Sequence, residues 1–256
     1  MLTPINQFKT ALRRGSTSFG LWVGLTDTVA VEIAACAGLD WLVLDGEHAP
    51  NDVQSLLRGL QALAAYPVSG IVRIPCADVT MMKRVLDIGA QTVVVPMIET
   101  ADQAHEMVRA VRYPPHGVRG IGTALARAAR WNRVSDYYQR ANEETCLIVQ
   151  IESQRGLDNI EAIAAIDGVD ALFIGPSDLA ASLGHLGDSS HREVREAIRN
   201  AFERIRASGK GCGSLVVEES VAREYLSQGC QFLALGVDTL LLAKATRALA
   251  AQFKPA

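Results

Sequence analysis

The sequence predicts an α/β protein, a single (β/α)8 barrel in which eight parallel strands alternate with helices. Two observations favour this fold. Short apolar runs recur at even spacing, and the stretches between them have the apolar spacing of helices. The length of 256 residues, 49% of them hydrophobic, matches one such barrel. The prediction places residues 1–256 in one barrel domain, with a long crossover between strands four and five.

The apolar runs predict strands that are buried on both faces, because they are apolar throughout and do not alternate with polar residues. In chain order, they are 19–25, 41–47, 70–75, 92–98, 146–152, 171–178, 211–217 and 232–238. Helical spacing is clear over 53–66, 101–112, 192–208 and 218–229. A doubly wound open sheet is the alternative. The barrel is favoured because no GxGxxG follows the first strand and because the strand count closes at eight.

The crossover from residue 112 to residue 145 is much longer than an ordinary loop. An excursion of this size in a compact domain is usually functional or lies at an interface. Arg127, Arg130 and Arg133 lie in it beside Trp131 and Tyr137. This pattern is a weak nucleic-acid signal, because the chain has a net charge of −3 and no overall basic field. We expect neither nucleic acid nor a membrane as a partner.

The cysteines indicate a reducing compartment. There are five, an odd number, and they are scattered without a CxxC pair. We therefore expect no disulfide framework and no cysteine-held zinc, and a cytoplasmic location is the simplest expectation. The first 15 residues contain no apolar core of signal-peptide length.

Polar residues gather where the predicted strands end, and chemistry in a (β/α)8 barrel sits at the C-terminal ends of its strands. The residues concerned are Asp45, Glu47, His48, Arg73, Gln150, Glu152, Ser177 and Asp178. Each has an ordinary structural explanation. Asp45, Glu47 or Asp178 could cap the next helix, and Arg73 could pair with Glu152 or Asp178. Their convergence on one rim favours a functional site.

The chemistry of this rim indicates a divalent cation. Carboxylates with few basic neighbours suit Mg²⁺, Mn²⁺ or Co²⁺, and an arginine beside the ion would stabilise an enolate. A histidine-held zinc at the rim is not expected, because the histidines other than His48 lie in presumed helices and loops. A Schiff-base aldolase needs a lysine on a strand. Each lysine lies instead in a helix, in a tail or at the start of a strand: Lys9, Lys83, Lys210, Lys244 and Lys254.

The sequence resembles the HpcH/HpaI aldolase family over essentially its whole length. The resemblance rests on the strings DGEHAPN (45–51), VPMIE (95–99), RYPPHGVRGIG (112–122), ALARAARWNR (124–133), VQIES (149–153), IGPSDLAASLG (174–184) and GVDTLLLA (236–243). It implies a metal-dependent pyruvate aldolase that reversibly cleaves a 4-hydroxy-2-oxo acid, such as 4-hydroxy-2-oxoheptanedioate, to pyruvate and an aldehyde such as succinate semialdehyde. It also implies a role in aromatic-compound catabolism and a homo-oligomer, usually a hexamer.

The resemblance further implies roles for individual residues. His48 matches the proton acceptor and Arg73 the group that stabilises the transition state. Asp87 matches a residue that raises the basicity of the histidine from a neighbouring subunit, a role that proximity in sequence would have given to Asp45. The remaining matches are Glu152 and Asp178 as metal ligands, Gln150 as a substrate contact, and the backbone at Ser177 and Asp178 as the clamp on the pyruvate carboxylate.

Two other functions stay open at this point. One is a related lyase that acts on a sugar acid, as 2-dehydro-3-deoxyglucarate aldolases do, or on a CoA ester through the same enolate. The other is a non-catalytic protein that binds 2-oxo acids, which we would expect to have lost His48 or a carboxylate. The sequence does not define the aldehyde partner.

Overall fold

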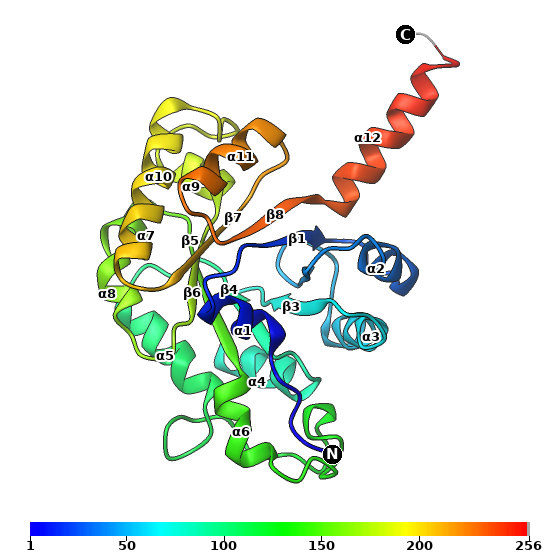
Figure 1. Cartoon of the computed structure of the whole chain (residues 1–256), viewed down its shortest axis with the longest axis vertical. Helices are drawn as coiled ribbons and strands as arrows, with labels where there is room; N and C mark the ends of the chain where they lie inside the picture. The colour runs from blue at the N-terminus through cyan, green and yellow to red at the C-terminus, as the bar shows by residue number, and fades with distance from the viewer. Residues whose placement is uncertain (255–256) are drawn as a thin grey trace.

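The computed structural model describes residues 1–254 and contains a closed barrel of eight parallel strands in sequence order, β1 to β8 (Figure 1). The predicted (β/α)8 barrel is confirmed, and the open sheet is excluded because β8 pairs with β1. The strands are β1 (Ser18–Val23), β2 (Trp41–Asp45), β3 (Ser69–Arg73), β4 (Thr92–Val95), β5 (Cys146–Ile151), β6 (Ala171–Ile174), β7 (Gly211–Leu215) and β8 (Phe232–Val237).

Helices follow the strands around the outside of the barrel. They are α1 (Gln7–Arg13), α2 (Thr28–Ala35), α3 (Val53–Leu63), α4 (Val79–Asp87), α5 (Ala101–Val111), η1 (Arg127–Ala129), α6 (Tyr137–Glu144), α7 (Gln154–Asp158), α8 (Ile160–Ala164), α9 (Pro176–Ser182), α10 (Arg192–Ala207), α11 (Glu219–Ser227) and α12 (Asp238–Ala251). The four helices expected from apolar spacing correspond to α3, α5, α10 and α11.

Each strand ends earlier than the apolar run that predicted it. The clearest case is β6, which ends at Ile174, whereas the run continues to Asp178. Pro176 begins α9 two residues later, because proline lacks the N–H of a strand ladder but suits the first turn of a helix. The polar residues at the ends of the runs therefore lie beyond the last ladder hydrogen bonds, in the loops at the rim.

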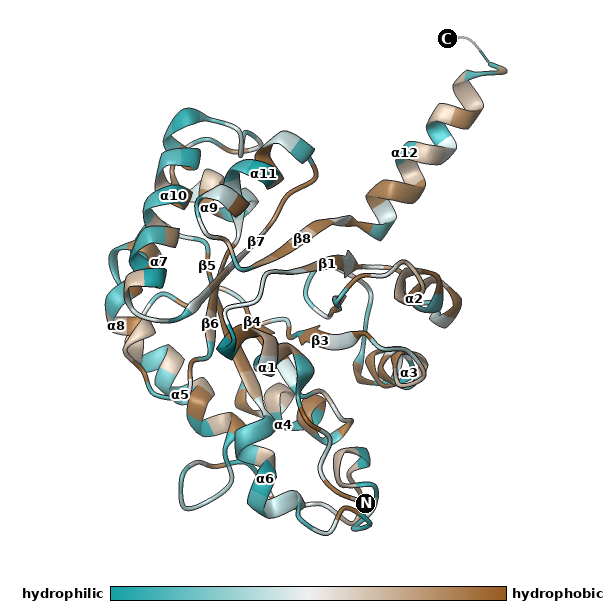
Figure 2. Cartoon of the chain, in the orientation of Figure 1, coloured by the Kyte–Doolittle hydropathy of each residue, from teal (hydrophilic) through white to brown (hydrophobic). Residues whose placement is uncertain are grey.

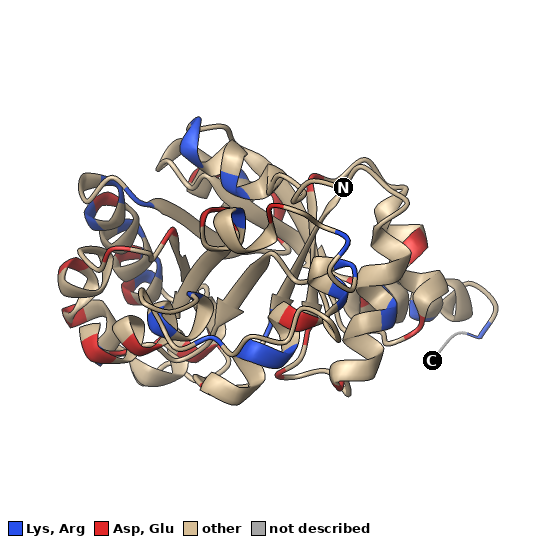
Figure 3. Cartoon of the chain, turned by 90° about the horizontal axis from the view of Figure 1, so that it is seen from below, with Lys and Arg blue, Asp and Glu red and all other residues tan. Residues whose placement is uncertain are grey.

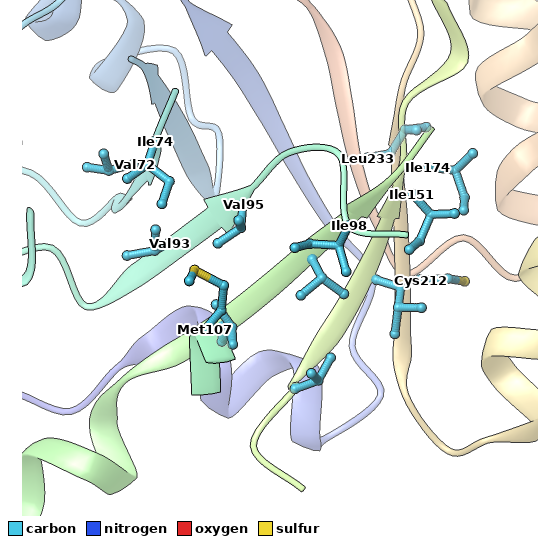
Figure 4. Close-up of a cluster of buried hydrophobic side chains, with 14 of the residues drawn as sticks. Val72, Ile74, Val93, Val95, Ile98, Met107, Ile151, Ile174, Cys212 and Leu233 are labelled. Carbon is cyan, nitrogen blue, oxygen red and sulfur yellow. The ribbon is translucent and has the colours of Figure 1, made fainter. Parts of the chain in front are cut away.

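Alternate residues of each strand face opposite sides of the barrel wall. In β2, Leu42 and Leu44 belong to the large core between strands and helices, and Trp41 and Val43 belong to the core inside the barrel. Figure 4 shows the outer core, where side chains such as Val93 and Ile151 meet helix residues. In Figure 2 the strands are largely brown, and in Figure 3 most charged residues lie on helices and loops.

The N-terminal end of the barrel is closed by aromatic packing. Phe8 of α1 contacts Trp41 and Phe232, with ring centroids 6.0 and 5.4 Å away in edge-to-face geometry. Gly20 makes room for the indole, because a Cβ at this position would lie 2.2 Å from Trp41 ring atoms. With this end filled, a substrate can enter only from the C-terminal ends of the strands.

The long crossover folds into a small layer of its own, with η1 and α6 as its regular elements. Its apolar core is made by Tyr113, Ala129, Val134, Tyr137 and Ala141. Arg119 is only 2% exposed and lies over the faces of the Tyr113 and Tyr137 rings. Arg127 donates to the carbonyls of Ile88 and Leu60 and so attaches this layer to the ends of α4 and α3.

Helix α12 departs from the usual arrangement, in which the last helix covers strands eight and one. It projects away from the barrel (Figure 1), and none of its described side chains is buried. Its leucines are therefore open to solvent, with Leu241 and Leu242 each 54% exposed. Within residues 1–254, no helix is long and apolar enough to cross a membrane.

Asn6 joins the N-terminal segment to the barrel floor. Its Nδ2 donates to the carbonyl oxygens of Gln91 and Glu144, at 3.1 and 3.0 Å. It also donates to Thr92 Oγ1 at 3.0 Å, and its Oδ1 caps α1 by accepting from Lys9 N at 2.9 Å. The side chain is 3% exposed, so loss of the amide would leave these partners without a hydrogen bond from the protein or from water.

We therefore predict that Asn6→Ala lowers the free energy of unfolding by about 2–3 kcal/mol, from the lost cap and the unpaired buried acceptors. Urea denaturation followed by circular dichroism measures this. The matched control is Asn200→Ala on the exposed face of α10, where we expect a change within about 0.5 kcal/mol. Equal losses in the two variants would contradict the role given to Asn6.

Candidate active site

The geometry of the barrel brings the strand-end groups together. Asp45 is paired in register with Arg73 of the neighbouring strand. Asp45, Arg73 and Gln150 follow the inward alternation of Val43, Ile71 and Ile148, so their side chains point into the barrel above the inner core. All three are at most 5% exposed. The predicted convergence on one mouth is therefore observed for these residues.

Arg73 is held by two carboxylates. Its Nε and Nη2 donate to Asp45 Oδ1 and Oδ2 at 2.8 and 2.6 Å, a bidentate pair in which both side chains are buried. Its Nη1 lies 2.7 Å from Glu47 Oε2 but out of line for a hydrogen bond, since that oxygen has no hydrogen-bond partner. The guanidinium also lies over the Trp22 ring, 4.9 Å from its centroid. Asp45 thus fixes the orientation of the arginine and leaves Nη1 available at the mouth.

The turn that carries His48 is built on the same strand pair. Gly46 N donates to Arg73 O at 2.8 Å, and a Cβ at Gly46 would lie 2.6 Å from that oxygen, so only glycine permits this approach. Glu47 N donates to Asp45 Oδ1 at 3.0 Å. His48 then points outward, with its side chain 65% exposed and its Nε2 3.8 Å from Glu47 Oε2. The imidazole is accessible to a ligand or to another chain.

Glu152 lies directly beyond β5 and is 3% exposed. One carboxylate oxygen accepts from Met97 N at 2.8 Å, and the other makes a short contact with Gln150 Nε2. The backbone of Met97 is left-handed, with φ of 54°, which costs a non-glycine residue about 1–3 kcal/mol. Gly175 passes close by on the other side, since a Cβ there would lie 2.5 Å from Glu152 Oε2.

Charge at this mouth is unbalanced. The pKa of Glu152 is raised to about 7, mainly by burial and also by the charges of Asp178 and Glu47, against hydrogen bonds from Met97 and Gln150 that lower it. Burial also raises the pKa of Glu47, although Arg73 opposes this. For Asp45, burial acts in the same direction but is outweighed by the hydrogen bonds and charge of Arg73, so its pKa is lowered. The hydrogen bonds of the arginine thus go to Asp45, its charge offsets that of Glu47 only in part, and Glu47, Glu152 and Asp178 repel one another.

Ser177 and Asp178 lie in the first turn of α9, where both side chains are exposed. The N–H groups in the first turn of a helix have no acceptor within the helix. They are therefore free to meet an anion at the end of β6, beside Gly175 and Glu152. The carboxylate of Asp178 acts on both Glu152 and Glu47 through its charge, so it belongs to the same mouth.

Asp87 is the one candidate that a single chain does not bring to this mouth. It ends α4, which runs back from β3, so it lies toward the opposite end of the barrel. Its Oδ1 accepts from Arg119 Nη2 at 3.3 Å, and its side chain is 39% exposed. The buried Arg119 therefore holds a carboxylate at the outer surface of the protein.

Several of the ordinary explanations considered above are wrong. The cap of α3 is Asp52, whose side chain accepts from Ser55 N, so neither Asp45 nor Glu47 caps this helix. No side chain caps α9, so Asp178 does not do so. Arg73 pairs with Asp45 and Glu47 and not with Glu152 or Asp178, because register places β2 beside it.

Sequence reasoning missed Met97 and Gly175. In the sequence, Met97 is only one letter of the string VPMIE. A methionine whose backbone lies in the left-handed region leaves no signal in a single sequence. Gly175 stands before Pro176 where a strand meets a helix, and glycine at such a junction can indicate a close backbone approach. The predicted placement of the lysines is confirmed, since all five described lysines lie outside the strands: Lys9, Lys83, Lys210, Lys244 and Lys254.

The raised pKa of Glu152 predicts that the metal-free protein loses stability as the pH rises from about 4.5 to about 7. In this window the folded state holds a proton that the unfolded state has lost, so the free energy of unfolding falls with rising pH. Glu152→Gln should reduce this fall in the free energy of unfolding by an amount on the order of 2–3 kcal/mol. Urea denaturation in EDTA from pH 4.5 to 7.5 measures it, with Glu106→Gln on the exposed face of α5 as control. Parallel profiles for wild type and Glu152→Gln would contradict the assignment.

Comparison with known proteins agrees with this geometry. Residues 18–245 match the family model described as HpcH/HpaI aldolase/citrate lyase. A hydroxypyruvate/pyruvate aldolase from Pseudomonas aeruginosa is 55% identical over 251 residues, which cover 98% of this chain and 94% of that protein. A 4-hydroxy-2-oxo-heptane-1,7-dioate aldolase from Escherichia coli is 51% identical over 248 residues, covering 97% and 95%.

A solved structure shows the same fold in detail. The crystal structure of an HpcH/HpaI aldolase/citrate lyase family protein from Burkholderia cenocepacia J2315 superposes with a TM-score of 0.93 and 41% identity, covering 96% of this chain and 98% of that one. Both the family model and the relatives span the strands that supply the mouth. The chain therefore belongs to the HpcH/HpaI aldolase/citrate lyase family and is an aldolase, a carbon–carbon lyase.

Proposed function

We propose that this aldolase reversibly cleaves 4-hydroxy-2-oxo acids to pyruvate and an aldehyde at the C-terminal mouth of the barrel, with a divalent cation as cofactor. The observation that carries the proposal is the crowding of Glu47, Glu152 and Asp178 around a mouth whose arginine is already paired. The names of the relatives support the substrate class, since one is a 4-hydroxy-2-oxo-heptane-1,7-dioate aldolase. We propose succinate semialdehyde as the aldehyde on that basis, within aromatic-compound catabolism.

The residues present fit a divalent cation. Glu152 and Asp178 would hold it, because their oxygens repel one another without it and because hard cations prefer carboxylate ligands. The oxygen of Gln150 is buried without a partner, which marks a polar group still to be satisfied at the same place. When bound, Mg²⁺, Mn²⁺ or Co²⁺ would polarise the 2-oxo group and stabilise the enolate.

The protein groups would bind and orient the substrate. The N–H groups of Ser177 and Asp178 would donate hydrogen bonds to the 2-oxo acid carboxylate at the start of α9, and Gln150 would contact the same end of the molecule. Arg73, with Nε and Nη2 fixed by Asp45, would direct Nη1 at the 2-oxo oxygen, which carries the negative charge of the enolate. Because Asp45 already orients the fork, little reorganisation is needed when negative charge develops.

His48 would accept the proton of the C4 hydroxyl. The bond between C3 and C4 then breaks, its electron pair enters the enolate, and the carbonyl of the aldehyde forms at C4. Protonation at C3 gives pyruvate. Running in reverse, the same groups would join pyruvate to an aldehyde, and the likeness to a hydroxypyruvate/pyruvate aldolase makes hydroxypyruvate a second nucleophile to test.

We further propose that the enzyme is a homo-oligomer, a hexamer by family resemblance. The support is α12, whose leucines project into solvent, together with the outer surface that it leaves bare. Leu235 of β8 is 41% exposed there, and Val29 and Ile33 of the adjacent α2 are 59% and 70% exposed. A second copy would cover both surfaces at once, since each chain offers a helix and a place for one.

In such an oligomer, we propose that Asp87 of one chain acts on His48 of another. Arg119 presents Asp87 at the surface, and His48 faces outward with Glu47 as its acidic neighbour. A carboxylate that hydrogen-bonds to the imidazole would orient it and favour its protonated form. This arrangement leaves each catalytic site incomplete in an isolated chain.

The metal proposal predicts that EDTA abolishes aldol cleavage and that Mg²⁺, Mn²⁺ or Co²⁺ restores it. Pyruvate C3 proton exchange, followed by NMR in deuterium oxide, should be lost and regained in parallel, because it needs the same enolate. Borohydride should trap no pyruvate adduct. Full activity in metal-free enzyme, or a reduced covalent adduct with any lysine, would overturn the mechanism.

If Asp87 of one chain acts on His48 of another, two variants that are each weakly active should complement one another in mixed oligomers. His48→Ala should lower kcat/KM for cleavage by about 10²–10⁴, the usual contribution of a positioned base. Asp87→Asn should lower it less, and the acid limb of its pH–rate profile should move to lower pH because the imidazolium is less favoured.

Mixing and reassembling the two variants should restore roughly a quarter of the wild-type activity, since random pairing gives one site in four with both native groups. Metal binding by each variant alone serves as the control for intact sites. Additive activity with no gain in proven mixed oligomers would show that His48 and Asp87 do not act across chains.

A further inference from the structure

A group of side chains of the types that can hold a metal ion lies outside the active site. His185 follows α9, and His191 and Glu193 begin α10 at the N-cap and first turn. One ligand atom from each of the three residues lies within 4.8 Å of the other two. Because α9 leaves the C-terminal end of β6, this group lies on the same side of the barrel as the mouth but beyond the far end of α9. The proposed reaction uses none of these residues.

One contact within the group has the spacing of neighbouring ligands in a coordination shell. His185 Nε2 and Glu193 Oε2 are 2.8 Å apart. Metal–ligand bonds of about 2.0–2.2 Å place neighbouring ligand atoms roughly 3 Å apart. The rings of His185 and His191 are stacked, with centroids 3.6 Å apart, so one ring has to turn before both imidazoles can bind one ion in their ring planes. The hydrogen bond that His191 Nδ1 accepts from Glu193 N is long, 3.3 Å, so coordination through that nitrogen would replace a weak contact.

The loop that carries the ligands is fixed by its own backbone. His185 N donates to Ala180 O at 2.7 Å, Asp188 N to His185 O at 2.9 Å, and His191 N to Asp188 O at 3.2 Å. Asp188 Oδ1 accepts from Ser190 Oγ at 2.6 Å, which holds that carboxylate within the same loop. The backbone that carries the ligands is therefore fixed before any ion binds, which reduces the entropy lost on binding.

The local charges favour a cation. Glu193 and Asp188 are both acidic, and the nearest basic side chain in sequence, Arg192, pairs with Glu196 at 3.1 Å. Two imidazoles and a carboxylate suit first-row transition ions such as Zn²⁺, Ni²⁺ or Cu²⁺ better than Mg²⁺, which prefers oxygen.

We propose that His185, His191 and Glu193 form a second, nitrogen-rich metal site that binds a first-row transition ion and is separate from the catalytic mouth. An ion there would join the C-terminal end of α9 to the start of α10. Since the first turn of α9 carries Asp178, this link would stabilise the helix that supplies the catalytic carboxylate.

The test is the Zn²⁺ stoichiometry of the full-length, metal-stripped enzyme, measured by isothermal titration calorimetry. The wild type should bind two Zn²⁺ per chain, one at each site. His185→Gln and Glu193→Gln should each weaken one of the two sites by more than about tenfold, because even residues outside a coordination shell can change affinity by that much. His116→Gln, which removes an exposed histidine elsewhere, should leave both sites intact.

Spectroscopy identifies the ligands independently of affinity. Cu²⁺ bound to Glu152→Gln, in which the catalytic site is weakened, should show electron paramagnetic resonance couplings from two imidazole nitrogens. The double variant with Glu152→Gln and His185→Gln should show one. Wild-type Zn²⁺ affinity at both sites in His185→Gln and in Glu193→Gln would overturn the proposal. So would a single Zn²⁺ per chain that disappears in Glu152→Gln.

Discussion

The constraint on which the site depends is the burial of negative charge that the protein's own cations do not neutralise. Glu152 is almost fully buried, and Asp178 and Glu47 act on it with charge of the same sign. The nearby Arg73 makes its two good hydrogen bonds to Asp45. Buried charges of one sign persist in a folded protein only when a proton or a cation offsets them. The proposed divalent cation would offset this charge, and an aldolase can use such a cation to stabilise an enolate.

The barrel supplies this arrangement through strand register and alternation. Inward-facing positions near the ends of β2, β3 and β5 place Asp45, Arg73 and Gln150 around one opening. The packing below them is apolar and rich in aromatic side chains, so these polar groups lie only at the C-terminal ends of the strands. Local backbone features then complete the site. Met97, whose backbone lies in the left-handed region, donates its N–H to Glu152. Gly175 permits the start of α9 to approach the same carboxylate.

The sequence predicted the parts of this site that depend on local pattern. Apolar runs located all eight strands, and the polar residues beyond them located the mouth. The partner of Arg73 was not predicted, because it depends on which strand lies beside β3 and in what register. The exposure of α12 was not predicted either. Only the three-dimensional arrangement shows that its own barrel does not cover the leucines of this helix.

The account is tested most directly by a crystal structure of the enzyme with Mn²⁺ and oxalate, a stable mimic of the pyruvate enolate. We predict one ion bonded to carboxylate oxygens of Glu152 and Asp178, with oxalate completing its shell and lying within hydrogen-bond distance of Arg73 Nη1. An ion that binds without Glu152 and Asp178, or oxalate bound away from the C-terminal ends of β5 and β6, would contradict the account.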